Sequence, residues 1–273
     1  MKTKLVAAIL MGTAILFITA TIVAGKGKSG EKGKAKEKAP SLERIEFIHW
    51  KKSFAKPPCN NNGICEPQLG ENPSCPDCKD ADDEEPSVLC YDFMGSYGKK
   101  LLKWKKLPVS YVVNPDVPAG LSADFVKAAV ADAAAEWDYW TEPELFSNAY
   151  GVSSDVQYGV LDGKNAVTFG DYTTAGVIGV TSVWYNPATK AIVEFDFMFD
   201  TDWTWGDATD PQTPDIMDLQ NIATHELGHA AGLADVYDGP CSDVTMYGYS
   251  DNGDTAKRTL GEPDIVGITT LYK

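Results

Sequence analysis

The sequence predicts an α+β fold, in which a mixed sheet is backed by helices, with a small cysteine-rich module ahead of it. Three observations predict this class. Runs of β-branched and aromatic residues recur between residues 109 and 199, and two stretches carry apolar residues at helical spacing. The length of 273 residues suffices for one sizeable core. We therefore expect one main domain and a small appendage.

Four runs are typical of strands because they combine β-branched and aromatic residues between turn formers. In the last of them apolar and polar residues alternate, as on a strand with one buried face. The runs are Val109–Val113, Ala166–Phe169, Val177–Tyr185 and Ile192–Phe199.

The first predicted helix begins after Ser122, whose hydroxyl can cap the free N–H groups of the first turn. Its apolar residues recur at helical spacing and its alanine-rich face permits close packing, so we expect a core helix. The stripe consists of Phe125, Val126, Ala129, Val130, Ala133 and Trp137.

A second helix is predicted before His225. Thr213 can act as its N-cap, with Pro214 at the first position and Asp215 in the first turn. Gly232 can take the left-handed conformation that ends a helix. The residues from 225 to 229 therefore fall at the C-terminal end of this helix.

Two of the three histidines, His225 and His229, are four residues apart. On a helix both imidazoles project from one face, so both can bind one zinc ion. Glu226 then points to the open side of the ion, where it can take a proton from a zinc-bound water. Asp235, three residues beyond Gly232, is placed to be the third ligand. The pattern favours a metal-dependent hydrolase over a chance H-E-x-x-H sequence on an ordinary helix.

A methionine, Met246, follows the motif after a short loop. H-E-x-x-H-x-x-G-x-x-H/D with such a methionine-bearing turn is the metzincin signature, and Asp as third ligand resembles the snapalysin branch. Over residues 88–273 the chain is similar in finer detail to matrixins. The matching segments, in matrixin order, are Lys103–Lys106 before the strand at 109–113, Asp196–Asp200, Met246–Tyr247 and Pro263–Tyr272.

This resemblance implies a zinc metalloendopeptidase domain over residues 87–273, with a five-stranded mixed sheet and three helices. It implies that His225, His229 and Asp235 bind zinc, that Glu226 is the general base, and that Met246 forms a floor beneath the metal. It also implies that residues 177–185 are an exposed edge strand on which a substrate peptide lies antiparallel. An inner strand would have the same composition.

The chain departs from the family pattern in three ways. No histidine lies between His49 and His225, so we expect no second, structural zinc. Asp196, Asp200 and Asp202 are candidate calcium ligands, but an acidic solvated loop fits them equally well. Gly248 stands where matrixins have a proline beside the specificity pocket. Tyr247 and Tyr249 are candidates to stabilise the oxyanion or to line the pocket, or they simply pack.

The N-terminus predicts export. Residues 1–25 have the basic and apolar regions of a secretory signal, and the apolar stretch is also long enough for an uncleaved membrane anchor. The six cysteines of the chain suit an oxidising compartment, so we expect a secreted protein. Residues 26–56 are predicted to be a basic linker followed by a short amphipathic helix from Ser41 to Lys52. This segment is a propeptide remnant or a packing element, and we expect His49 within it to be an ordinary residue.

The remaining cysteines form a module and a pair. Four lie in residues 57–86 among turn formers and acidic residues, which predicts two disulfides of undetermined pairing, with calcium as an added stabiliser. Cys90 lies where a matrixin propeptide holds the cysteine that blocks the zinc. Its flanking residues do not match that pattern, so we favour a disulfide with Cys241 over a latch.

The composition limits the partners. The net charge of −15 argues against nucleic acid as a partner. We expect a monomer that acts on a protein or peptide substrate, with the N-terminal apolar segment as a candidate membrane tether. Two other classes stay open: a zinc hydrolase of non-peptide amides, and a catalytically silent zinc-binding adhesion module.

Overall fold

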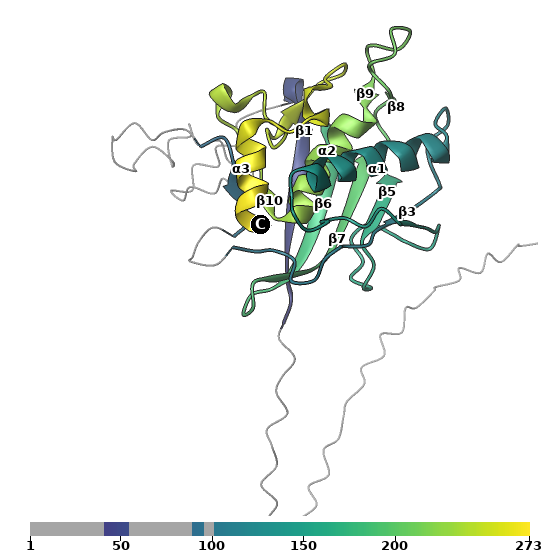
Figure 1. Ribbon diagram of the computed structural model, residues 1–273. Coiled ribbons are helices and arrows are strands. Elements are labelled where there is room, and N and C mark those ends of the chain that lie inside the picture. The colour runs from purple at the N-terminus through teal and green to yellow at the C-terminus, as the bar shows by residue number, and fades with distance from the viewer. Residues whose placement is uncertain (1–40, 55–88, 96–100) are drawn as a thin grey trace, which may run out of the picture. The chain divides into compact units, whose positions relative to one another are not determined.

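The computed structural model describes residues 41–54, 89–95 and 101–273 (Figure 1). Within these ranges the α-helices are α1 (Ala123–Tyr139), α2 (Leu219–Ala231) and α3 (Glu262–Leu271), and the 3-10 helices are η1 (Lys52–Phe54), η4 (Gly239–Cys241) and η5 (Ala256–Arg258). The strands are β1 (Glu43–Lys51), β2 (Asp92–Phe93), β3 (Val112–Val113), β4 (Gly151–Val152), β5 (Ala166–Gly170), β6 (Val177–Asn186), β7 (Ala191–Asp200), β8 (Trp205–Gly206), β9 (Met217–Asp218), β10 (Leu233–Ala234) and β11 (Tyr249–Ser250).

The main sheet is mixed and has seven strands in the order β11-β1-β6-β7-β5-β3-β4. Strands β3, β5, β6 and β7 fall on the four predicted runs, and β4 brings the number to the five that the family resemblance implied. The additional two are β1, which pairs antiparallel with β6, and β11, which pairs parallel with β1. The expectation of five strands was therefore too low, because the sequence did not reveal that the N-terminal segment joins the sheet.

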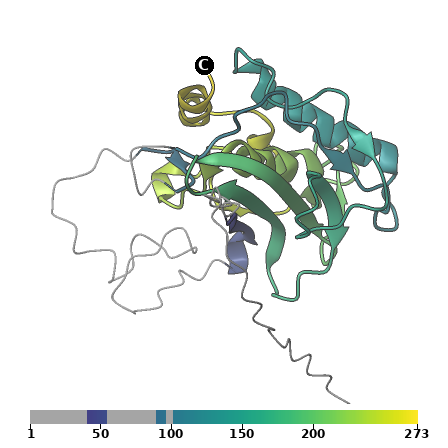
Figure 2. The same cartoon turned by 90° about the horizontal axis from the view of Figure 1, so that it is seen from below.

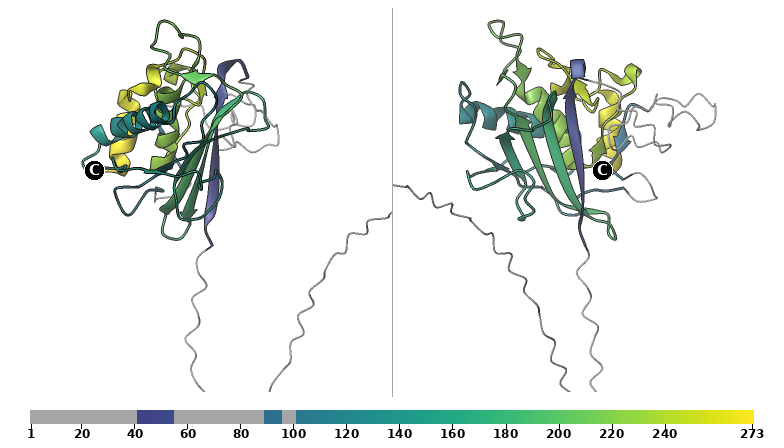
Figure 3. Two further views of the ribbon diagram at one scale, coloured as in Figure 1. Left: turned by 90° about the vertical axis from the view of Figure 1, so that its right-hand side faces the viewer. Right: turned by 180° about the vertical axis from the view of Figure 1, so that it is seen from behind.

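The helices lie on one side of this sheet (Figure 3). A view from below shows the twist of the strands (Figure 2). Helix α2 packs between the sheet and α1, and its residues are almost all buried. Ser122 caps α1 as predicted, since its side chain accepts a hydrogen bond from the backbone N–H of Phe125 at 3.1 Å. The core between the helices and the sheet thus encloses α2, the helix that carries the motif.

The segment that we expected to be an amphipathic helix is strand β1. Its inward side chains, Ile45, Phe47 and His49, alternate with outward ones, which is the period of a strand. Eight residues of β1 are in register with β6, from Glu43 opposite Tyr185 to Trp50 opposite Val177. The mixed apolar spacing hid this alternation, because both faces of β1 are partly apolar.

Helix α2 begins five residues later than the sequence predicts. Its N-cap is Asp218, whose carboxylate accepts a hydrogen bond from the backbone N–H of Asn221 at 2.9 Å. Residues 217 and 218 instead extend to pair with β8, and Arg258 donates to the Asp218 carboxylate. The Thr213-Pro214 signal was therefore misleading, because tertiary pairing keeps the following residues extended.

A disulfide joins Cys90 to Cys241 across a sequence separation of 151 residues. It ties the segment that leads into β2 to the loop before Met246. The predicted signal or anchor (residues 1–25), the basic linker and the cysteine-rich module (57–86) lie outside the described residues. Among the described residues, no helix is both long and apolar enough to span a bilayer.

Candidate metal centre

The end of α2 brings the predicted ligands together. Gly232 is the C-cap and has a φ of 118°, the left-handed conformation that reverses the chain. A side chain at Gly232 would meet the carbonyl oxygen of Leu102 at 2.8 Å, so the turn also needs the space of a glycine. The reversal places Asp235 opposite the histidines of the preceding helical turn.

Three acceptor atoms converge at this point. Nε2 of His225 and Nε2 of His229 are 3.1 Å apart, and Oδ1 of Asp235 lies 3.1 Å from the first and 3.4 Å from the second. Atoms bound to zinc at about 2.0–2.2 Å in tetrahedral geometry are roughly 3.3–3.6 Å from one another. The spacing therefore fits a zinc ion with three protein ligands and one open position.

Hydrogen bonds on the far side of each ring fix which nitrogen faces the centre. Nδ1 of His225 donates to the carbonyl oxygen of Thr245 at 2.7 Å, and Nδ1 of His229 donates to that of Leu233 at 3.0 Å. A carbonyl oxygen only accepts, so each neutral ring presents the lone pair of Nε2 to the centre. Burial also lowers the pKa of His225 to about 3, which keeps that ring neutral.

Asp235 completes a set of acceptors that no donor satisfies. Its Oδ1 is buried and has no hydrogen-bond partner among the described residues, whereas Oδ2 accepts a hydrogen bond from the hydroxyl of Tyr237 at 3.1 Å. Buried acceptors without donors are costly unless a cation neutralises them. The donor set thus fits a divalent metal, and Tyr237 is a supporting residue that the sequence analysis missed.

Glu226 lies beside this centre. The hydroxyl of Thr181 on β6 donates to its Oε2, while Oε1 has no hydrogen-bond partner in the described structure. A side chain at Gly179 would come within 2.9 Å of Oε1, so the glycine leaves room for the carboxylate. Burial raises the pKa of Glu226 to about 7. Such a carboxyl group can both accept and donate a proton near neutral pH.

The turn at Met246 supports the centre from below. Met246 is fully buried against α2, and a side chain at Gly228 would come within 2.2 Å of its sulfur. The backbone N–H groups of Thr245 and Met246 donate to the carboxylate of Asp264 at the start of α3. The methionine-bearing turn is therefore fixed to α3, a role of Asp264 that the sequence did not suggest.

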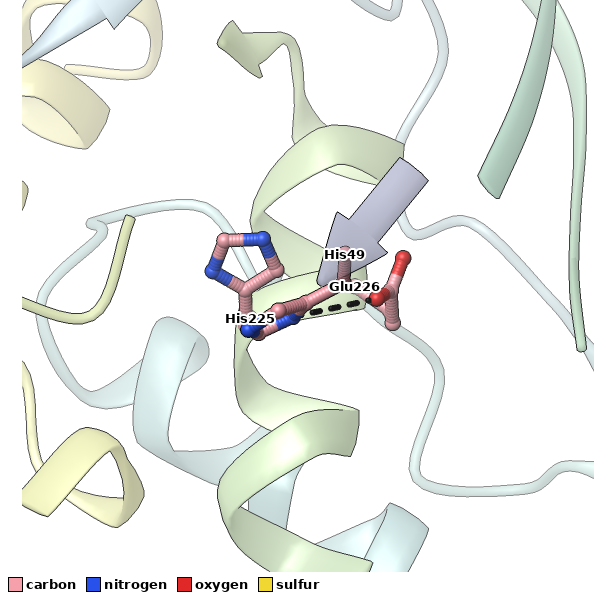
Figure 4. A group of neighbouring side chains, drawn as sticks. All are labelled: His49, His225 and Glu226. Atoms are coloured by element: carbon pink, nitrogen blue, oxygen red, sulfur yellow. Dashed lines mark ion pairs between the residues drawn. The ribbon is translucent and has the colours of Figure 1, made fainter. Parts of the chain in front are cut away.

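His49, which we expected to be an ordinary residue, lies at the centre. Its Nδ1 is 3.4 Å from Oε1 of Glu226, and its ring centroid is 3.9 Å from that of His225. Figure 4 shows the side chain projecting from β1 toward Glu226, with the ring of His225 beside it. A lone histidine carries no local signal of such a role, since only the pairing of β1 with β6 brings it here.

Polar groups surround the far side of the His49 ring. Nε2 of His49 is 3.1 Å from Oγ of Ser250 and 3.2 Å from Nζ of Lys257, which also donates to the carbonyl oxygen of Tyr247. Lys257 is only 5% exposed, and burial lowers its pKa to about 7. We call the place that the His49 ring occupies among Ser250, Lys257 and Tyr247 the His49 pocket. A buried lysine beside the candidate metal centre was not anticipated.

The predicted pocket tyrosines have other neighbours. Tyr249 belongs to β11 and pairs with Trp50 of β1, while Tyr247 offers its carbonyl oxygen to Lys257. Gly248 between them is explained by Tyr237, because a side chain there would lie 2.3 Å from the Tyr237 ring. Tyr237, rather than either predicted tyrosine, is hydrogen-bonded to a predicted zinc ligand.

The three candidate calcium ligands do not form one group. Asp196 accepts hydrogen bonds from the backbone N–H groups of Gly159, Val160 and Ala166, so it holds a loop instead. Asp200 and Asp202 come together with Asp171, with one carboxylate oxygen of each within 4.8 Å of the others. The structure thus groups Asp171, rather than Asp196, with Asp200 and Asp202.

Comparisons with known proteins show which sequences this chain resembles. A sequence model of the matrixin family matches residues 103–273. Matrix metalloproteinase-18 of Xenopus laevis is 29% identical over 198 residues, covering 69% of this chain and 38% of that protein. Matrix metalloproteinase-C of Caenorhabditis elegans is 27% identical over 179 residues, which are 64% of this chain and 29% of the relative.

Stromelysin-1 of Mus musculus is 29% identical over 177 residues, or 62% of this chain and 33% of that protein. The matched region thus spans well under half the length of each of these relatives. The family match covers more than half of this chain, including α2, the turn at Met246 and α3. The chain therefore belongs to the matrixin family.

Proposed function

We propose that this protein is a zinc-dependent endopeptidase in which His225, His229 and Asp235 hold the metal. The observation that carries the proposal is the convergence of three buried acceptor atoms at 3.1–3.4 Å. When bound there, zinc supplies a Lewis acid that polarises the scissile carbonyl and makes water more acidic. The membership of this chain in the matrixin family supports the same assignment.

Glu226 is the general base of the proposed reaction. The Thr181 hydroxyl holds Oε2, which leaves Oε1 to take a proton from the attacking water. The same carboxyl group then delivers this proton to the departing amine, so the peptide bond breaks without a charged leaving group. A pKa near 7 suits a group that must do both.

In this proposal a peptide substrate binds along β6. The expected exposed edge strand is an inner strand in this structure, between β1 and β7, so the substrate takes the side that β1 occupies. An extended segment that adds to a sheet edge makes backbone hydrogen bonds of low sequence preference, which suits an endopeptidase. The antiparallel pairing of β1 with β6 supports this mode, because β6 offers its backbone to a strand beside Glu226.

Two further proposals concern calcium and location. Asp171, Asp200 and Asp202 are proposed to hold a calcium ion, since Oδ2 of the buried Asp200 has no hydrogen-bond partner within the described ranges. An extracellular location is supported by the signal-like N-terminus and by the disulfide between Cys90 and Cys241.

The test compares the full chain and residues 87–273 with their Glu226→Ala variants, measuring zinc content and cleavage of casein. We expect about one zinc per chain in every protein and cleavage only where Glu226 is present. Equal cleavage by the Glu226→Ala variants would contradict the assignment of the base. Zinc binding without cleavage of casein by either wild-type protein would favour the non-peptide or non-catalytic alternatives.

A further inference from the structure

Strand β1 occupies the path that a substrate would take under the proposed function, on which this inference rests. It lies between β6 and β11, pairing with the first over eight residues and with the second through Trp50 and Lys51. On its outer side, Arg44 and Glu46 hydrogen-bond to Ser182, and Tyr158 donates to Glu46. The strand is therefore seated along its whole length.

Two inward side chains of β1 cover the catalytic centre. The ring of Phe47 is stacked on that of His229, with centroids 4.1 Å apart and planes within 8°. His49 lies two residues further, against His225 and Glu226, with its other nitrogen in the His49 pocket. Pairing with β6 and β11 alone does not require these contacts. Strand β1 nevertheless contacts both proposed histidine ligands and the proposed base.

The consequence for catalysis is steric. With β1 in place the side chain of Glu226 is 0% exposed, so neither bulk water nor a scissile peptide reaches its carboxylate. Because β6 is already paired, a substrate strand has no backbone groups to bind on that edge. The nine residues of β1 therefore block both the access of water to Glu226 and the binding of a substrate strand to β6.

We propose that β1 is a built-in substrate mimic that keeps the enzyme latent, with His49 as the side chain that fills a substrate pocket, and that activation is the release of β1. The cysteine at position 90 does not serve as the latch in this structure, since its sulfur is bonded to Cys241. The inhibitory contact is instead made by a histidine on a paired strand.

Release requires a single cut after β1. Residues 1–55 contain no cysteine, so no disulfide would retain them. While tethered, β1 competes at an effective concentration that reaches the millimolar range, whereas the freed segment competes at its bulk concentration. A micromolar affinity is therefore enough to block the intact chain and too weak to block a dilute, cleaved one.

The first experiment uses the full chain with a specific protease sequence inserted between Ala55 and Lys56. We expect the intact protein to cleave casein at least about tenfold more slowly than the same protein after cutting and dilution. The full-length His49→Ala and Phe47→Ala variants should be partly active without a cut. Glu43→Gln, at the exposed end of β1, is the matched control and should stay as latent as the wild type.

A readout independent of activity follows hydrogen exchange. The backbone N–H groups of β6 that face β1 should be protected in the intact chain and lose protection after the cut. A labelled peptide of residues 41–54 should bind the cut Glu226→Ala protein in competition with substrate. The His49→Ala peptide should bind about tenfold more weakly, and the Glu43→Gln peptide should match the wild type.

The outcomes separate the two proposals. Equal cleavage of casein before and after the cut would overturn the proposed latency, but it would agree with the proposed endopeptidase activity. Absence of cleavage in both states, with zinc bound, would instead overturn the proposed endopeptidase activity. Hydrogen exchange of β6 and binding of the 41–54 peptide would still show whether β1 leaves after the cut. Protection of β6 that persists after cutting and dilution would show that β1 is a permanent strand.

Discussion

The carbonyl oxygen of Thr245 accepts a hydrogen bond from Nδ1 of His225 at 2.7 Å. The N–H of the same residue donates to Oδ2 of Asp264 at 2.8 Å. Thr245 thus connects a predicted zinc ligand on α2 to a buried carboxylate on α3. The orientation of His225 consequently depends on a residue 39 positions away along the chain.

Asp264→Ala should lower the affinity for zinc by about 10- to 100-fold, as expected for loss of a group that orients a ligand. The backbone N–H groups of Thr245, Met246 and Gly261 would lose their acceptor, so the free energy of unfolding should fall as well. Competition with a chelator measures the affinity. Glu262→Ala, an exposed change in the same helical turn, is the control, and equal affinities in the two variants would contradict this role.

Glu226→Ala should abolish cleavage without loss of zinc. Glu226 is outside the set of converging acceptors, so the three ligands remain, while the base that accepts the proton is removed. In the cut protein we expect kcat to fall by several orders of magnitude. Turnover at the wild-type rate, with equal zinc content, would show that another group is the base.

Replacement of both Cys90 and Cys241 by alanine should destabilise the protein by at most about 5 kcal/mol, the chain-entropy limit for a loop of this length. Cys241 packs with Val236 and Val244 between Asp235 and Met246, so the ligand loop should also loosen. Urea unfolding with and without reductant measures the effect. If this disulfide stabilises the fold, the free energies of unfolding of wild type and variant should differ without reductant and agree with it.

The local parts of the fold were predictable from the sequence. Strands β5 to β7 and helix α1 match their expected ranges within one or two residues, because periodicity and the Ser122 cap are local signals. The start of α2 and the nature of β1 were not predictable in this way. Both depend on pairing with distant strands, and such tertiary contacts override local propensity.

The site divides along the same line. His225, Glu226, His229 and Asp235 fall within eleven residues, so their spacing alone predicts a metal centre. His49 and Lys257 come from distant segments with no motif around them. Their positions follow from the register of β1 on β6 and from the course of η5, which no short window of sequence encodes.

Asp196 predicts a pH dependence of stability. Burial raises its pKa to about 7, above the value near 3.9 of an unfolded chain. The folded state therefore binds the extra proton between these values, and the stabilisation, complete below pH 4, is lost as the pH rises through 7. The difference in unfolding free energy between wild type and Asp196→Asn should fall by at most about 1.4 kcal/mol per pH unit. Urea titrations from pH 4 to 8 test this, and parallel curves would contradict it.

The buried ammonium of Lys257 should determine which substrate side chain the His49 pocket accepts. Once β1 has left, the ammonium of Lys257 and the hydroxyl of Ser250 lose His49 as a partner and face the place that its ring occupied. A carboxylate or carboxamide can accept hydrogen bonds from both, and a nearby carboxylate also favours the charged form of the lysine. An aliphatic side chain would leave these buried groups without partners, which costs binding energy.

Peptides that differ only at the residue bound in this pocket measure the preference through kcat/KM. We expect the cut protein to favour glutamate, glutamine or histidine over leucine by about tenfold. Lys257→Met should reverse this order, because the pocket then becomes apolar. Lys164→Met, which changes an exposed lysine, should preserve the wild-type order. A preference for leucine that Lys257→Met leaves unchanged would mean that the substrate side chain binds elsewhere than in the His49 pocket.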